Sequence, residues 1–447
     1  MQAILNFFTG PLNTVAWLYI FLPCVMIGGV LLTVRTGFIQ FRRFGYAMKN
    51  TAGKMFKKAE AGHGAVTPLQ AVTTALAATV GTGNIVGTSQ AIALGGYGAV
   101  FWLWLAALMG MVVKYSEVTL SVHYRQRDAH GDWVGGPMYY ITNGMGAKWK
   151  WLAVVFAIFA VLASFGIGNM SQINSIAGNM NAAFGVPTLV TGLCLMVVTA
   201  LIVIGGLKRV AAVTEKLVPI MALFYIIGCV IILVMNASAI PNAFVQIFTL
   251  AFQPQAIAGG VAGVTVQQAM RYGVARGLFS NEAGLGSTPH AHALAKVKQP
   301  QDQGALAIIG VFVDTFVILT LTALVLITSG LIPEGMTGTA LTQAAFSLTF
   351  GSFGKVFIAI CMLFFAFSTI LGWYFFGQVN FNALFGSKYT KVYSLIVVLF
   401  ILIGSSLKVD LVWALADFFN GLMAVPNLLA LLALSGVVAG IARNKKD

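Results

Sequence analysis

Two glycine-rich interruptions of apolar stretches carry the residues best suited to binding chemistry. The first is A-A-T-V-G-T-G-N at 77–84, with apolar sequence on both sides. Because glycine is unfavourable inside a helix, a short unwound stretch is expected here. Its free N–H groups could hold a carboxylate, and its free carbonyls could bind a hard cation such as sodium. Close helix packing through small residues is the alternative interpretation.

The second interruption is G-L-F-S-N-E-A-G-L-G-S-T-P at 277–289. It again combines glycines with polar side chains, including Asn281 and the acid Glu282. An acid at membrane depth is a candidate functional residue, because burying its charge in lipid is costly. A simple loop between two shorter helices is the alternative.

Composition indicates that these segments lie in a membrane. The chain has 447 residues, of which 59% are hydrophobic and 9% charged, whereas a soluble domain carries about 25% charged residues. Its apolar runs are continuous rather than alternating, which favours helices over the strands of a membrane barrel. We therefore expect an all-α polytopic membrane protein forming one domain over 1–447. The net charge of +14 fits basic cytoplasmic loops, so it does not indicate a nucleic-acid partner.

The hydropathy pattern predicts about eleven transmembrane helices. With the N-terminus outside, the inner segments hold most of the 26 Lys and Arg residues, and the outer ones hold only Lys355 and Lys408. This bias predicts a cytoplasmic C-terminus. Residues 35–58 mix aromatic and basic residues, which predicts a cytoplasmic amphipathic segment lying on membrane lipid. The expected spans are 14–34, 66–93, 98–123, 151–178, 187–205, 210–235, 263–290, 304–330, 352–382, 392–406 and 409–438.

The two interruptions occupy matching places. Each opens a block of five spans, 66–235 and 263–438, with 14–34 as an extra helix in front. Because five is odd, the second block must be inverted relative to the first. Paired interrupted helices in two inverted repeats indicate a transporter with its site near the membrane midplane.

Other polar residues fall inside predicted spans. Asn169 and Gln172 could reach a substrate or form hydrogen bonds between helices. Asp314 could lie near a substrate amine or a cation, or pair with Arg271, Arg276 or Lys114. Lys114 and Glu117 are three residues apart on one helical face, so we expect them to pair with each other.

Three segments resemble the alanine/glycine:cation symporter family. They are A-T-V-G-T-G-N-I-V-G (78–87), G-G-P-M-Y-Y-I (135–141) and F-S-N-E-A-G-L-G-S-T-P (279–289), and the resemblance extends over nearly the whole chain. It implies a leucine-transporter-like fold in a bacterial inner membrane. It also implies import of a small neutral amino acid, alanine or glycine, coupled to sodium by alternating access. No enzyme activity and no cofactor other than the coupling ion are implied.

The resemblance also assigns roles to residues. Gly81, Thr82 and Gly83 would offer N–H groups to the substrate carboxylate. A sodium site would take Ala77, Val80, Phe365, Ser368 and Thr369, and Asn84 matches a possible second site. Phe165, Phe279 and Trp373 would form pocket walls. The complete expected substrate set is Thr79, Gly81, Thr82, Gly83, Phe165, Asn169, Gln172, Phe279, Asn281, Glu282, Asp314 and Trp373.

Other function classes stay open at this point. Glu282 and Asp314 keep a proton-coupled symporter as an alternative. An ion channel would need a symmetric oligomer or a repeated filter loop, and neither signature is present in the sequence. An intramembrane enzyme would need a nucleophile with its base, or a metal cluster, at membrane depth.

Overall fold

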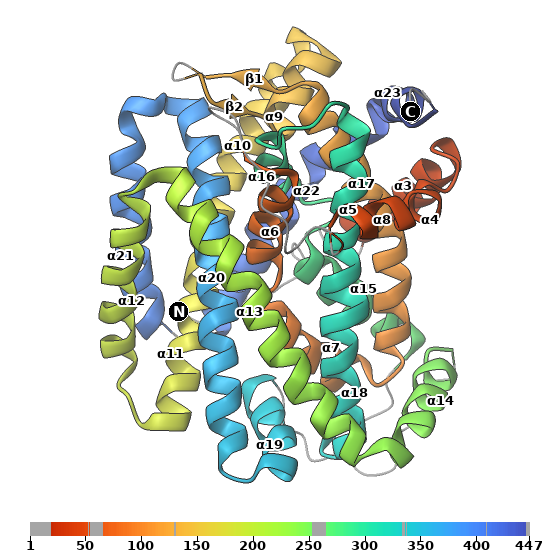
Figure 1. Cartoon of the computed structure of the whole chain (residues 1–447), viewed down its shortest axis with the longest axis vertical. Helices are drawn as coiled ribbons and strands as arrows, with labels where there is room; N and C mark the ends of the chain where they lie inside the picture. The colour runs from red at the N-terminus through yellow and green to blue at the C-terminus, as the bar shows by residue number, and fades with distance from the viewer. Residues whose placement is uncertain are drawn as a thin grey trace.

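The computed structural model describes most of the chain as helix (Figure 1). This confirms the expected all-α class; the one sheet in the described part is a two-stranded hairpin, β1–β2. The described residues are 19–51, 53, 66–128, 131–252, 265–332, 336, 338–407 and 409–443. The first part of predicted span 14–34, the start of span 263–290 and part of segment 35–58 lie outside them.

The first interruption is a broken helix. Helix α6 (Pro68–Thr79) ends before Val80, the π-helical turn η3 (Gly83–Gly87) follows, and α7 (Thr88–Gly95) continues the chain. Thr67 caps the start of α6 with Gln70, each side chain accepting a hydrogen bond from the other's backbone N–H. This capping box fixes where α6 starts.

The second interruption is a longer break between α15 (Val266–Asn281) and α16 (Pro289–Ala293). Glu282, Gly284 and Gly286 all have positive φ, which ends the helix and turns the chain. A second Thr-x-x-Gln capping box, Thr265 with Gln268, starts α15. Both broken helices therefore begin with the same capping motif.

The helices pack into two groups around these breaks. In the first group, which we call the bundle, the broken helices pack against α8 and α17. The N–H of Val66 donates to Leu294 O at 3.0 Å, so the start of α6 is also tied to the end of α16. The other bundle elements are α8 (Ala99–His123), α17 (Pro300–Val311), the π-helical η8 (Phe312–Leu319) and α18 (Thr320–Ser329).

The second group, which we call the scaffold, packs around the long helix α20 (Phe353–Phe385). Figure 1 shows α12 and α21 on the side of α20 away from α15 and α17. The other scaffold elements are α10 (Lys150–Phe165), the π-helical η6 (Gly166–Met170), α11 (Ser171–Phe184), α12 (Thr188–Val203) and α21 (Thr390–Ser406).

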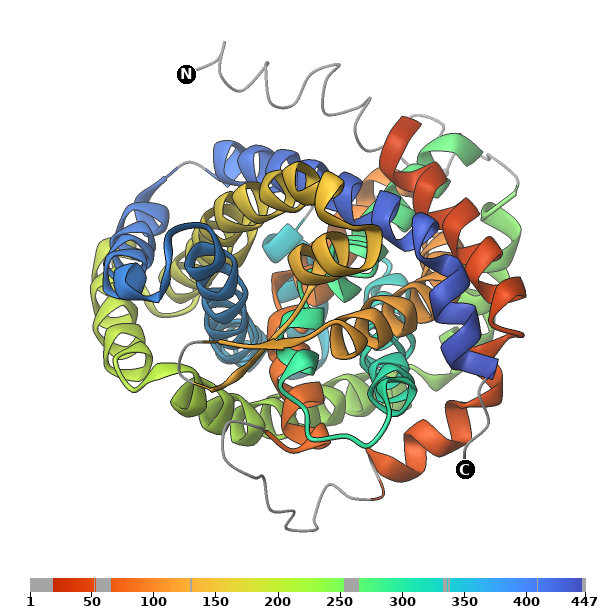
Figure 2. The same cartoon turned by 90° about the horizontal axis from the view of Figure 1, so that it is seen from above.

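The remaining elements surround the two groups. Figure 2 shows α3 and α23 side by side along one edge. Helices α14 and α19 were not predicted as separate elements. The bounds are α3 (Leu22–Arg35), α4 (Ile39–Arg42), α5 (Phe44–Asn50), β1 (Gln126–Arg127), β2 (Trp133–Val134), α9 (Pro137–Tyr140), η4 (Ile141–Met145), η5 (Ala147–Trp149), α13 (Gly206–Met235), η7 (Ala237–Ala239), α14 (Ile240–Leu250), α19 (Gly338–Phe350), η10 (Ser387–Tyr389), α22 (Val409–Ala433) and α23 (Ser435–Arg443).

Within the described residues, six helical stretches are long and apolar enough to cross a membrane, or seven with the bent pair that ends in α23. The predicted number of eleven is not confirmed by this count. The broken helices are one reason, because each half of α6–α7 and α15–α16 is too short by itself.

The described part of segment 35–58 forms two short helices, α4 and α5. Gly37 and Phe38 have positive φ and turn the chain after α3. Ala47 on α5 then packs with Ala305 and Ile309 of α17, whereas Phe38 and Phe41 are exposed. One face therefore covers the bundle, and the other exposes aromatic side chains together with Arg42, as expected of a helix lying on lipid.

Candidate functional site

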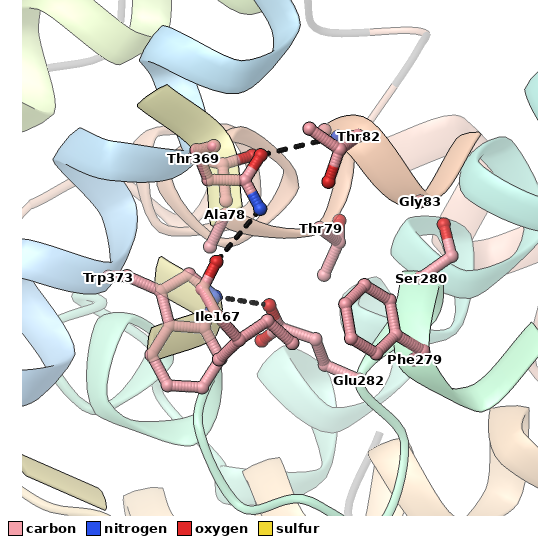
Figure 3. A pocket seen from close by; sticks show the side chains of 12 residues that line it. Ala78, Thr79, Thr82, Gly83, Ile167, Phe279, Ser280, Glu282, Thr369 and Trp373 are labelled. Carbon is pink, nitrogen blue, oxygen red and sulfur yellow. Dashed lines mark hydrogen bonds between the residues drawn. The ribbon is translucent and has the colours of Figure 1, made fainter. Parts of the chain in front are cut away.

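A closed pocket lies between the two broken helices and the scaffold. Its cavity is about 10 Å³, room for about one water molecule, so the lining side chains must move apart before an amino acid can enter. Trp373, Phe279 and Glu282 surround it, and each is no more than 4% exposed. Figure 3 shows Trp373 coming from α20 opposite Phe279 and Glu282. The lining residues are Ala78, Thr79, Gly81, Thr82, Gly83, Ile167, Gln172, Phe279, Ser280, Glu282, Thr369 and Trp373.

The first break points polar groups at this pocket. The N–H of Gly81 donates to Asn84 Oδ1 at 2.8 Å, and the N–H of Thr82 donates to Gln172 Oε1 at 3.3 Å. The Thr82 hydroxyl is buried without a hydrogen-bond partner among the described residues. A negatively charged ligand would compete well for the long Thr82–Gln172 bond, because charge-assisted hydrogen bonds are the stronger ones.

Glu282 is the acid that lines the pocket. Trp373 Nε1 donates to its Oε1 at 2.7 Å, and the Ser287 hydroxyl donates to its Oε2 (Figure 3 shows the Trp373 bond). An ionised carboxylate has about four acceptor positions. Glu282 therefore keeps capacity for a further donor from a ligand.

Five oxygen atoms converge beside the pocket, where α20 meets the end of α6. The Ser368 and Thr369 hydroxyls each lie 3.1 Å from Ala77 O, and that of Thr369 lies 3.5 Å from Val80 O. The same hydroxyls lie 2.8 and 3.1 Å from Phe365 O. This brings together all five residues of the expected sodium site in an all-oxygen arrangement typical of a hard-cation site.

Asn84 and Asp314 form a second polar cluster behind the pocket wall. Asn84 Nδ2 donates to Asp314 Oδ1 at 2.7 Å, and the Ser280 hydroxyl donates to the same oxygen at 2.9 Å. The Thr315 hydroxyl donates to Asp314 Oδ2 at 3.0 Å. Because Asn84 also accepts from Gly81 N–H, it connects the buried carboxylate of Asp314 to the unwound backbone.

Four residues of the expected substrate set lie elsewhere. Phe165 stacks on Phe400 with ring centroids 4.9 Å apart. Asn169 Nδ2 donates to Val397 O, which is the interhelical alternative for this residue. Asn281 donates to the Thr315 hydroxyl, and Asp314 is separated from the pocket by Ser280.

Four lining residues were not predicted for the substrate set, namely Ala78, Ile167, Ser280 and Thr369. Ile167 reaches the pocket from η6, where the helix widens to a π-helical turn. The sequence G-I-G-N at 166–169 has the same pattern as G-T-G-N at 81–84. This repeated pattern could have predicted η6 as a third place where a helix is irregular and carries polar side chains.

Charged residues of α8 fasten the second break. Lys114 Nζ donates to Glu282 O at 2.9 Å and to the Thr288 hydroxyl at 2.7 Å. Glu117 Oε1 accepts from Gly286 N–H at 3.1 Å and from Asn427 Nδ2 at 2.6 Å. The expected Lys114–Glu117 pair is present at 3.8 Å. The unpaired backbone groups of the break thus have fixed partners inside the protein.

Comparison with known proteins agrees with this architecture. The chain is 43% identical to the sodium/alanine symporter AgcS of Methanococcus maripaludis, covering 95% of this chain and 94% of that protein. It is 38% identical to a probable sodium/glutamine symporter, GlnT, of Bacillus subtilis, covering 98% and 90%.

Among solved structures, MhsT in complex with L-phenylalanine matches with a TM-score of 0.56 at 14% identity, covering 86% of this chain and 99% of that one. That likeness confirms the leucine-transporter-like fold. The model of the sodium:alanine symporter family matches residues 1–446. The chain therefore belongs to the sodium:alanine symporter family, a family of multi-pass membrane transporters.

Proposed function

We propose that this protein imports a small neutral amino acid, alanine or glycine, together with sodium. The observation that carries the proposal is the position of Thr369. Its hydroxyl belongs to the five-oxygen cluster, and the residue also lines the closed pocket. An ion in the cluster and a substrate in the pocket would therefore be neighbours, as coupled transport requires.

Sodium is the proposed ion for the cluster of Ala77, Val80, Phe365, Ser368 and Thr369. Its ligands would be three carbonyl oxygens and two hydroxyl oxygens, which suit a hard cation. Each hydroxyl can rotate its proton away and turn a lone pair toward the ion. Such neutral ligands have no proton to release near neutral pH, which favours sodium over proton coupling at this site.

The pocket supports a zwitterionic substrate of small size. The carboxylate would face the Thr82 and Gly83 end of the first break, where backbone N–H groups and the unpartnered Thr82 hydroxyl lie. The ammonium group would face Glu282. Phe279, Ile167 and Trp373 would enclose the side chain and limit its size.

The Asn84–Asp314 cluster is proposed as a second cation-binding position, for sodium or a proton. Asp314 is fully buried, and the described residues place no basic group in a salt bridge with it. A cation would relieve the cost of this buried charge. Asn84 also accepts a hydrogen bond from Gly81 N–H. Binding of a cation beside Asp314 would therefore influence the first break, where the substrate is proposed to bind.

Alternating access is supported by the closure of the pocket on both sides. At one end, Gln343 on α19 donates to Asn179 on α11 at 2.9 Å, and at the other end α16 packs against α8, α20 and β2. A channel would instead need a continuous path. With the N-terminus outside a bacterial inner membrane, as the charge bias predicts, the β1–β2 end would be cytoplasmic.

The test is uptake of labelled alanine, glycine and glutamine into proteoliposomes. Accumulation that requires an inward sodium gradient, and that favours alanine or glycine, is the expected result. Uptake with a proton gradient alone would contradict sodium coupling. Preferred uptake of glutamine would contradict the proposed substrate, and absence of uptake by correctly inserted protein would overturn both.

A further inference from the structure

One side chain of the bundle is buried inside the scaffold. His290, on the short helix α16, is 2% exposed. Helix α16 itself packs mainly on α8 and α6 of the bundle. The His290 ring nevertheless points to α10 and α20, which belong to the scaffold. Any separation of the two groups at this end must withdraw the ring.

Both ring nitrogens of His290 have partners. Nδ1 lies 2.6 Å from Ser287 O, and Nε2 lies 3.0 Å from Asn380 Nδ2 on α20. Because a carbonyl oxygen can only accept, Nδ1 carries the proton and donates, and Nε2 accepts from the Asn380 amide. The neutral ring thus satisfies one bond within the bundle and one across to the scaffold.

Two phenylalanines hold the ring from the scaffold. Phe156 on α10 stacks on it with centroids 6.3 Å apart and planes at 16°. Phe376 on α20 lies 6.0 Å away at 33°. Aromatic contacts at these separations are favourable. They surround the hydrogen-bonded ring with apolar surface and leave little room for water.

The G-G-P segment that precedes α9 completes the enclosure. A Cβ atom at Gly136 would lie 2.6 Å from the Cδ2 and Nε2 atoms of His290, and Gly136 has a φ of +122°. A Cβ atom at Gly286, in the break itself, would lie 2.6 Å from Pro137 Cγ. Gly136 therefore allows the segment to approach His290 closely, and Gly286 allows Pro137 to approach the break.

His292, two residues further along α16, differs in one respect. It is equally buried at 2%, but its Nδ1 accepts from Gln303 Nε2 on α17 at 2.8 Å. Its hydrogen bond therefore stays within the bundle. The two histidines share chemistry, burial and helix, and only His290 joins the two groups.

We propose that His290, held by Asn380, Phe156 and Phe376, is the gate that closes the substrate pocket on the face carrying α9 and β1–β2. The gate opens when α16 moves away from α20 and the ring leaves the two phenylalanines. This inference rests on the proposed function, because it assumes that the pocket opens to each face in turn.

The experiment measures access to the pocket from each face. A reporter, Ser280→Cys, is placed in a background with Cys24, Cys194, Cys229 and Cys361 replaced by alanine. A membrane-impermeant maleimide is added to vesicles of known orientation. Arg127→Cys, on exposed β1, identifies which vesicles present the α9 face. Labelling needs no substrate and no ion gradient.

His290→Ala should raise the labelling rate of the reporter about tenfold from the α9 face only, because a hydrogen bond and two ring contacts are lost. His292→Ala is the matched control and should leave the rate unchanged. Asn380→Leu should raise it about threefold, which tests the same contact if His290→Ala does not fold.

An unchanged rate in folded His290→Ala or Asn380→Leu protein, or an equal rise in His292→Ala, overturns the gate. A loss of sodium-dependent uptake in the unmodified protein would instead overturn the proposed function. That result would leave the labelling comparison intact, so the two failures are distinguishable.

Discussion

Both broken helices leave backbone carbonyl groups without helical partners, and the two breaks satisfy these groups in different ways. At the second break, Lys114 donates to the carbonyl of Glu282, so the protein supplies the cation at the end of α15. At the first break, the carbonyls of Ala77 and Val80 receive the Thr369 hydroxyl. No ion pair of the described residues includes a basic group there. The carboxyl end of a helix carries partial negative charge, so the first break suits a cation from solution.

This difference in partners fits the proposal that the first break, and not the second, exchanges its partners for ligands. The second break is held by Lys114 and Glu117, which are both buried, and it presents Glu282 in a fixed place. The first break is held by neutral side chains, including Asn84 and Gln172. Neutral partners can be exchanged for ligands at lower cost than a buried ion pair.

Removing the Lys114 ammonium group should have the largest effect, on the stability of the fold. Lys114→Met leaves Glu117 without its charged partner and the Glu282 carbonyl without a donor, so we expect a loss of about 3–5 kcal/mol of stability. Thermal unfolding of purified protein measures this loss. Adding Glu117→Gln should restore part of it, because the amide oxygen can still accept from Gly286. Unchanged stability of the single variant would contradict the comparison.

Removing the hydroxyls at the first break should instead affect ion use. Ser368→Ala with Thr369→Ala should raise the half-saturating sodium concentration about 10- to 100-fold, as two neutral ligands are lost, with a smaller change in maximal uptake. Thr322→Ala, a buried hydroxyl on α18 bonded to Tyr225, is the control. Equal half-saturating sodium concentrations in the unmodified protein, the double variant and Thr322→Ala would contradict the sodium-site assignment.

Adding a single methyl group at the first break tests the sodium site more locally. A Cβ atom at Gly81 would overlap the Thr369 hydroxyl, whereas at Gly87 its nearest neighbour is 4.0 Å away. Gly81→Ala should therefore raise half-saturating sodium about tenfold, and Gly87→Ala should change it by less than about twofold. Sodium-activated uptake measures both. Similar values for the two variants would mean that the oxygen cluster does not hold the ion.

The smallest effect is expected at the pocket wall that faces Glu282. Trp373→Phe removes the hydrogen bond to Glu282, which contributes about 1 kcal/mol to holding the ring in place. Because the wall then limits side-chain size less strictly, uptake of glutamine relative to alanine should rise about fivefold. Competition between labelled substrates measures this ratio. Trp104→Phe also loses a tryptophan hydrogen bond, to Thr320, and should leave the ratio unchanged. A ratio that does not change in Trp373→Phe would exclude this residue from size selection.

The sequence predicted the parts of the fold that depend on backbone chemistry. Glycines together with polar residues predicted both breaks, and composition indicated the membrane. The short helices α14 and α19 were missed, because an apolar helix too short to cross a membrane has no distinctive composition.

Side-chain directions near the site were harder to predict. A π-helical turn inserts one residue and rotates everything after it by about 100°. The turn η6 contains Asn169, whose amide donates to Val397 O, and it brings Ile167 to the pocket. The turn η8 contains Asp314, whose partners come from three different elements. Such long-range contacts leave no local pattern in the sequence.

The shared position of Thr369 has a thermodynamic consequence. If sodium tightens amino-acid binding by some factor through this hydroxyl, the amino acid must tighten sodium binding by the same factor. Reciprocity of this kind limits futile cycling, since a carrier loaded with only one of the two partners is sparsely populated. On the proposed function, one residue common to both sites would help to protect the ion gradient from dissipation without nutrient uptake.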